Sequence, residues 1–218
     1  MADVRCVLHL AAILGTGETL AHLDRTFYVN VQGTLAVFEA ALSSGVSTFF
    51  YPTQPGIWPN PYSMTKRAGQ ELLLFAARHF PIDIRILRWL NAYGPGQKHL
   101  PVRKAVPYFI IRSLFDKRIL IFGDGEAPVD LEYVDDIARI TTAYVYSDRV
   151  ANDPTPRDTG AAIRLTVNQL AARIKDLTGS RSELVHVPMR PGEDPKQQIR
   201  PLPGPTAAAI LGIPAQSI

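Results

Sequence analysis

The 218-residue sequence has one cysteine, no long apolar run and no cluster of basic residues. The single cysteine, Cys6, cannot form an internal disulfide bond, so we expect a reducing, cytoplasmic location. We expect no membrane association, because no apolar stretch could span a bilayer and the first residues lack a signal-peptide layout. The net charge is only +3 and the 23 basic residues are scattered, which argues against a nucleic-acid partner.

Histidine is also sparse, and its distribution argues against a metal site. Metal-binding helices commonly carry two histidines four residues apart, and no such pair occurs here. The five histidines are His9, His22, His79, His99 and His186. We therefore expect no metal ligand set.

What is present is typical of a globular domain: 46% of the residues are hydrophobic and 20% are charged. Strand-like and helix-like segments alternate through the first 90 residues. That order predicts parallel strands with helices on both faces of the sheet. The expected elements are strands at Val4–Leu10, Ser47–Tyr51 and Ile82–Leu90, with helices at Thr34–Leu42 and from Asn60-Pro61 to His79.

The pattern changes after residue 96. Helices are predicted at Val106–Lys117, Asp135–Tyr146 and Thr166–Thr178, and strands at Ile119–Phe122 and Ala162–Leu165. The proline-rich stretch from Pro188 onward predicts an irregular end. We expect a core at 1–96 to which 130–168 returns, and a smaller subdomain formed by 97–129 and 169–218.

Tyr62 and Lys66 are the first candidates for chemistry. Four-residue spacing on a helix places the two side chains on one face, one turn apart. A nearby ammonium favours the phenolate form of tyrosine, so the pair can transfer a proton. The pair alone is a weak signal, because a solvated helix face contains the same spacing by chance.

The context of this pair is more specific. In order and spacing, the segments around it closely resemble the extended short-chain dehydrogenases, the NAD-dependent epimerase/dehydratase family that includes UDP-glucose 4-epimerase. The segments are Leu8-His9-Leu10-Ala11-Ala12, Val29–Thr34, Tyr62 with Lys66, Leu87–Gly96, Gly123-Asp124-Gly125, Tyr133–Ala138 and Arg190–Glu193. The resemblance implies a Rossmann-like, doubly wound α/β fold with a small C-terminal substrate-binding subdomain.

The resemblance also implies roles for individual residues. Catalysis would involve Tyr62 as acid and base, Lys66 as the group that lowers its pKa, and Thr53 as a hydrogen-bond partner of the reacting hydroxyl. The cofactor, NAD or NADP, would be bound by Leu10, Ala11, Ala12, Asn30, Tyr62, Lys66 and Leu90. The substrate would be bound by Thr53, Asn91 and Arg190, the last at a phosphate.

The implied activity is epimerisation or reduction of a sugar nucleotide by hydride transfer. The family resemblance further implies a homodimer that pairs the helices near Thr34–Leu42 and Lys66–His79 across a two-fold axis.

The sequence departs from the family pattern in four places. The glycine-rich unit that grips the pyrophosphate is expected to be absent, and Gly15-Thr16-Gly17 does not replace it because Leu20 follows where Gly or Ala is needed. Thr53 and Tyr62 are only nine residues apart. Val129 stands where an arginine is usual. Gln54 replaces an acidic residue of the dehydratases, which makes dehydration less expected. These departures keep open an alternative, a truncated or degenerate relative that is a non-catalytic binding or structural protein.

Overall fold

The computed structural model describes residues 4–55, 59–160, 163–193 and 200–214. Its largest sheet has four parallel strands in the order β1-β2-β3-β7. They are β1 (Cys6–Leu8), β2 (Thr48–Thr53), β3 (Asp83–Arg88) and β7 (Arg157–Asp158). The α/β fold with a parallel sheet predicted from the order of the elements is confirmed.

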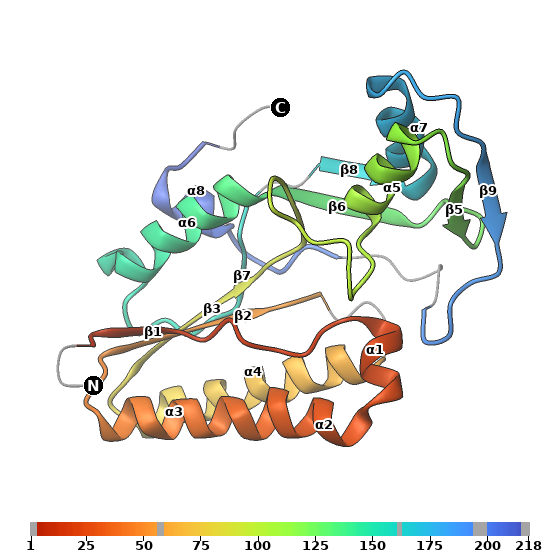
Figure 1. Ribbon diagram of the computed structural model, residues 1–218. Helices are drawn as coiled ribbons and strands as arrows, with labels where there is room; N and C mark the ends of the chain where they lie inside the picture. The colour runs from red at the N-terminus through yellow and green to blue at the C-terminus, as the bar shows by residue number, and fades with distance from the viewer. Residues whose placement is uncertain (1–3, 56–58, 161–162, 194–199, 215–218) are drawn as a thin grey trace.

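Helices cover both faces of this sheet (Figure 1). Along one face run α1 (Thr16–Ala21), α2 (Leu23–Phe27), a π-helix (Tyr28–Gln32), α3 (Gly33–Ser43) and α4 (Pro61–His79), and on the other lies α6 (Val134–Tyr146). Successive residues of β2 point to opposite faces. Phe49 belongs to the core under α3 and α4, whereas Phe50 packs with α6 and the short helix α8 (Ala207–Leu211).

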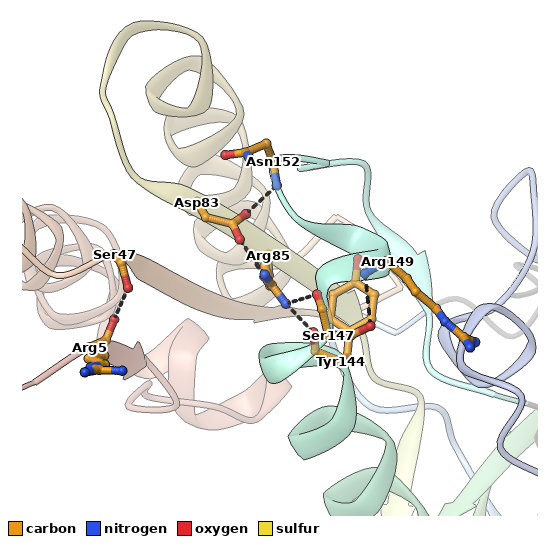
Figure 2. Close-up of polar contacts among 8 residues, drawn as sticks. All are labelled: Arg5, Ser47, Asp83, Arg85, Tyr144, Ser147, Arg149 and Asn152. Atoms are coloured by element: carbon orange, nitrogen blue, oxygen red, sulfur yellow. Dashed lines mark hydrogen bonds and ion pairs between the residues drawn. The ribbon is translucent and has the colours of Figure 1, made fainter.

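Arg85 ties β3 to the end of α6 (Figure 2). Its guanidinium donates to the carbonyl oxygens of Tyr144 at 2.6 Å and Ser147 at 2.9 Å, and it pairs with Asp83 at 2.6 Å. The other oxygen of Asp83 accepts from the backbone N–H of Asn152 at 3.0 Å. A cation is favoured at a helix C-terminus, where carbonyl groups have no partner within the helix. Arg85 therefore fixes the position of α6 on the sheet.

The rest of the chain builds a smaller unit. Strands β4 (Asn91–Tyr93), β6 (Pro128–Tyr133) and β8 (Ile163–Thr166) form a mixed sheet, and β5 (Ile119–Phe122) pairs with β9 (Leu184–Val187). Helices α5 (Ala105–Leu114) and α7 (Val167–Leu177) pack on these strands around Phe109, Ile121 and Leu170. A 3₁₀ turn (Asp148–Val150) follows α6.

Several of the expected boundaries differ from the structure. The helix expected to reach Lys117 ends at Leu114, and Asp116 has a φ of 48°, which a helix cannot continue through. The strand expected at Val4–Leu10 is limited to Cys6–Leu8. The expectation of an irregular end after Pro188 is wrong at α8, which Gly212 ends at a φ of 69°. In the described residues, no helix is long and apolar enough to cross a membrane.

Candidate active site

The helix that bears Tyr62 and Lys66 has a capped first turn. Asn60 Oδ1 accepts from the backbone N–H of Ser63 at 2.9 Å, and Ser63 Oγ accepts from the backbone N–H of Asn60 at 3.1 Å. Pro61 occupies the first helical position, where no backbone N–H is needed. This capping box fixes where α4 begins, so Tyr62 and Lys66 lie in its first and second turns.

Lys66 is buried against an aromatic ring. Only 5% of the residue is exposed, and its Nζ lies 3.7 Å from the ring centroid of Tyr51 on β2. The Tyr51 hydroxyl donates to the Lys66 carbonyl oxygen at 3.3 Å. Burial lowers the pKa of Lys66 to about 7, because the ammonium loses its hydration. The face of the ring replaces part of that hydration by a cation–π contact.

Tyr62 differs from the expectation in its protonation. The sequence predicts that Lys66 lowers the pKa of this phenol, but burial raises it. The pKa of Tyr62 shifts opposite to the expectation because of where Lys66 lies. The ammonium of Lys66 contacts the ring of Tyr51, and burial favours its neutral form. At neutral pH the phenol of Tyr62 is consequently protonated.

His9 extends this group on the side of β1. Its ring is 6.1 Å from that of Tyr51 and inclined by 24°, and its Nε2 is 3.0 Å from the hydroxyl of Thr34. Burial and, to a smaller extent, the charge of Lys66 lower the pKa of His9. Within the described ranges, no three His, Cys, Asp or Glu side chains are grouped so that they could hold a metal ion.

Asn30 connects the segment after β1 to α4. It lies in the π-helix and is 1% exposed. Its Oδ1 accepts from the backbone N–H of Ile13 at 2.7 Å, and its Nδ2 donates to the Ile13 carbonyl at 2.8 Å and to Thr65 Oγ1 at 3.0 Å. Thr65 in turn donates to the carbonyl of Tyr62 at 2.9 Å. Asn30 therefore holds the chain after Leu10–Ala12 against the turn that bears Tyr62.

The other predicted residues lie at the carboxyl edge of the main sheet. Leu10, 53% exposed, and the small Ala11 and Ala12 follow β1, and Thr53, 5% exposed, is the last residue of β2. Leu90 follows β3. Because parallel strands end at the same edge, the sequence positions that the resemblance assigns to the cofactor are brought to one side of the sheet.

Glu132 is a residue of this region that sequence reasoning missed. It is 5% exposed on β6, and its carboxylate accepts from the backbone N–H of Leu90 at 3.0 Å and from that of Gly160. Burial raises its pKa to about 7. The only available signal was an acidic residue at alternate positions, Asp130 and Glu132, of a strand that would otherwise bury apolar side chains.

A cavity of about 320 Å³ lies on the side of the smaller unit. Asn91 and Arg190, two of the three predicted substrate residues, line it together with Lys104 and Glu18. Arg190 lies 4.8 Å from the ring centroid of Phe122 and pairs with Glu193 at 2.6 Å. Burial lowers the pKa of Lys104. The cavity thus combines cationic groups with an aromatic wall.

The predicted residues therefore form two groups. Tyr62, Lys66 and Asn30 gather beside the main sheet, and Asn91 and Arg190 gather in the cavity. Tyr62, Lys66 and Thr53 are not part of the cavity lining. Sequence reasoning also missed the cavity wall formed by Gly15, Thr16 and Glu18, because Gly15-Thr16-Gly17 was considered only as a pyrophosphate loop.

Comparison with known proteins gives a consistent result. The profile of the family described as "NAD dependent epimerase/dehydratase family" matches residues 1–155. The UDP-N-acetyl-alpha-D-glucosaminuronate decarboxylase of Bacillus cytotoxicus is 29% identical over 203 residues, 84% of this chain and 62% of the relative. The UDP-glucuronate 4-epimerase of Thermodesulfobacterium geofontis is 31% identical over 159 residues, 65% of this chain and 48% of the relative.

Among solved structures, the UDP-glucose 4-epimerase of Thermotoga maritima with UDP-glucose is similar to this chain with a TM-score of 0.83. It is 28% identical, and the match covers 90% of this chain and 68% of that one. The chain spans 62% of the length of the Bacillus cytotoxicus relative and 48% of the Thermodesulfobacterium one.

Proposed function

Because the chain belongs to the NAD-dependent epimerase/dehydratase family, we propose that it takes part in NAD-dependent hydride transfer on a sugar nucleotide, as an epimerase or reductase. The observation that carries the proposal is the link made by Asn30, which ties the chain after β1 to the Tyr62 turn of α4. The non-catalytic alternative is not favoured, since the relatives named above are enzymes.

The residues at the carboxyl edge of the sheet fit a dinucleotide. Small Ala11 and Ala12 and exposed Leu10 allow close approach to the backbone, and the buried Nζ of Lys66 offers hydrogen-bond donors for a ribose. The chemistry that NAD supplies when bound is acceptance and return of a hydride at the substrate carbon.

Tyr62 would donate or accept the proton that accompanies hydride transfer. With a pKa raised by burial, its phenol is protonated at neutral pH and can donate to a substrate alkoxide. To take a proton from a carbinol it must ionise, and a protonated Lys66 favours that form. Thr53, buried at the end of β2, would hydrogen-bond the reacting hydroxyl.

The 320 Å³ cavity would receive the nucleotide part of the substrate. Arg190 can bind a phosphate through two parallel N–H groups once it exchanges Glu193 for that anion. Asn91, the first residue of β4, lines the cavity and would contact the sugar. The solved relative from Thermotoga maritima contains UDP-glucose, which supports a nucleotide diphosphate sugar as the substrate class.

A second copy of the chain is the proposed protein partner, through α3 and α4. These helices expose Val37 at 37%, Met64 at 49% and Phe75 at 58%. Apolar side chains on neighbouring helices are typical of a helix-to-helix interface. Small-angle scattering that shows only monomers at tens of micromolar chain would contradict this proposal.

The test of the function begins with NADH binding by the purified 218-residue chain, followed by cofactor fluorescence and by melting temperature. Turnover is then measured with UDP-glucose, and Tyr62→Phe is the matched variant because it keeps the ring. We expect the variant to keep the fold and the NADH affinity and to lose at least about 100-fold in turnover. Undiminished turnover in Tyr62→Phe would rule out the acid and base role, and no NADH binding by the folded chain would rule out the proposed function for this polypeptide.

A further inference from the structure

Glu132 is a buried carboxylate that joins two backbone segments. It accepts a hydrogen bond from the backbone N–H of Leu90 at 3.0 Å and one from that of Gly160, and the residue is 5% exposed. Hydrogen bonds to an ionised acceptor are roughly twice as strong as those between neutral groups. The two amides are therefore held firmly as long as the carboxylate is ionised.

These two amides lie beyond the ends of neighbouring strands. Leu90 is two residues past β3, and Gly160 is two residues past β7, its partner in the main sheet. Glu132 itself is on β6, which belongs to the other sheet and pairs with β4 just after Leu90. One side chain thus fastens the carboxyl edge of the large sheet to the smaller unit.

The charges around Glu132 do not neutralise it. Arg88 of β3 faces it but binds Asp158 of β7 through two hydrogen bonds of 2.6 and 2.9 Å. Asp136 of α6 and Tyr133 line a cavity of about 20 Å³ together with Glu132. None of the ion pairs found in the described part of the chain includes Glu132. The two backbone amides contribute most to stabilising its charge, and Arg88 adds a smaller contribution that Asp158 opposes.

We propose that Glu132 is a positioning residue, whose ionised carboxylate holds the Leu90–Asn91 segment in place and whose protonation at mildly acidic pH releases it. An ionised carboxylate accepts strong hydrogen bonds at both oxygens, whereas a protonated one turns one oxygen into an O–H donor and keeps only neutral, weaker acceptors for the two amides. The inference rests on the proposed function, because that function assigns Leu90 to the cofactor and Asn91 to the substrate.

Protonation of Glu132 has opposite effects on two properties: it weakens the contact that positions Leu90, and it makes the folded chain more stable. Burial raises the pKa of Glu132 from 4.5 to about 7. Between these values the folded chain binds the extra proton, so this group makes the fold less stable as pH rises. The hold on Leu90, in contrast, strengthens as pH rises through 7. If Glu132 served stability alone, its contact with Leu90 would not be weaker at low pH, where this group makes the fold more stable.

The direct test is the amide proton shift of Leu90 and Gly160 in the ¹⁵N-labelled 218-residue chain, followed from pH 5.5 to 8.5. We expect both resonances to move together with a midpoint near 7, and this movement to disappear in Glu132→Gln. Asp136→Asn is the matched control, because it removes another acid near Glu132. In this variant the midpoint of the amide titration should stay close to neutral pH. Amide shifts that do not titrate, or that titrate equally in Glu132→Gln, would overturn the inference.

NADH affinity at pH 6 and pH 8 is the second measurement. We expect the wild-type chain to lose severalfold more affinity on acidification than Glu132→Gln, in which Lys66 still titrates. Equal pH dependence in the two chains would also overturn the inference. If neither chain binds NADH while the amides titrate as expected, the proposed function fails and the hold of Glu132 on Leu90 stands.

Discussion

Lys66 should make the fold less stable at neutral pH, and its replacement by methionine should reveal by how much. Burial lowers its pKa from 10.5 to about 7. Between these values the unfolded chain binds more protons than the folded chain, so the free energy of unfolding rises with pH from 7 to 10.5. Since one pKa unit corresponds to 1.36 kcal/mol, the whole effect is about 5 kcal/mol.

Relaxation around the ammonium reduces this figure, and we expect about 3 kcal/mol in practice. Methionine has a similar length and no charge, so Lys66→Met should be more stable than the wild-type chain by that amount at pH 6.5 and similar to it at pH 10. The measurement is urea unfolding at pH 6.5, 8 and 10. The difference between the two chains removes the contributions of His9 and Lys104, whose pKa values are also lowered.

Lys117→Met is the control, because Lys117 is exposed. It should change the free energy of unfolding by less than about 0.5 kcal/mol at every pH. A difference between Lys66→Met and the wild-type chain that stays constant from pH 6.5 to 10 would refute the reasoning. The same variant should lose NADH affinity, so that a gain in stability accompanies a loss of function, as is common for active-site residues.

Two further predictions concern stability. Arg88→Met should lower the free energy of unfolding in urea by about 3–5 kcal/mol, because it leaves the buried Asp158 without its ion-pair partner. Adding Asp158→Asn should recover part of this loss. A double variant no more stable than Arg88→Met would contradict the explanation. Gly69→Ala should cost about 1–3 kcal/mol, because its Cβ would lie 2.4 Å from the Tyr51 hydroxyl. Its control is Gly17→Ala, where a Cβ meets nothing within 4 Å, and equal melting temperatures for both variants would show that Tyr51 moves freely.

Local signals in the sequence predicted the parts of the fold that depend on neighbouring residues. Asn60 and Pro61 fix the start of α4, and Gly45, with a φ of 69°, follows the end of α3. The spacing of Tyr62 and Lys66 followed from the same local helix. Each of these features is decided within a few residues along the chain, where sequence patterns are informative.

Features that depend on contacts between distant segments were not predicted. Tyr51 and Lys66 meet because β2 lies beneath α4, and Glu132 meets Leu90 because of the register between β4 and β6. The direction of the pKa of Tyr62 depends on burial, which the Tyr–Lys spacing does not specify. Burial and register are products of tertiary packing, and so they appear only in the structure.

The π-helix at Tyr28–Gln32 has a consequence for insertions and deletions. Each residue advances an α-helix by about 100° of rotation. The extra residue of a π-turn therefore changes the direction of the side chains that precede it relative to those that follow. Asn30 reaches both Ile13 and Thr65 from this turn. A deletion of one residue at 28–32 would restore a regular helix and rotate Asn30 out of its place, although every core side chain would keep its identity. The length of this short stretch is therefore as important for the position of Asn30 as the identity of the residue itself.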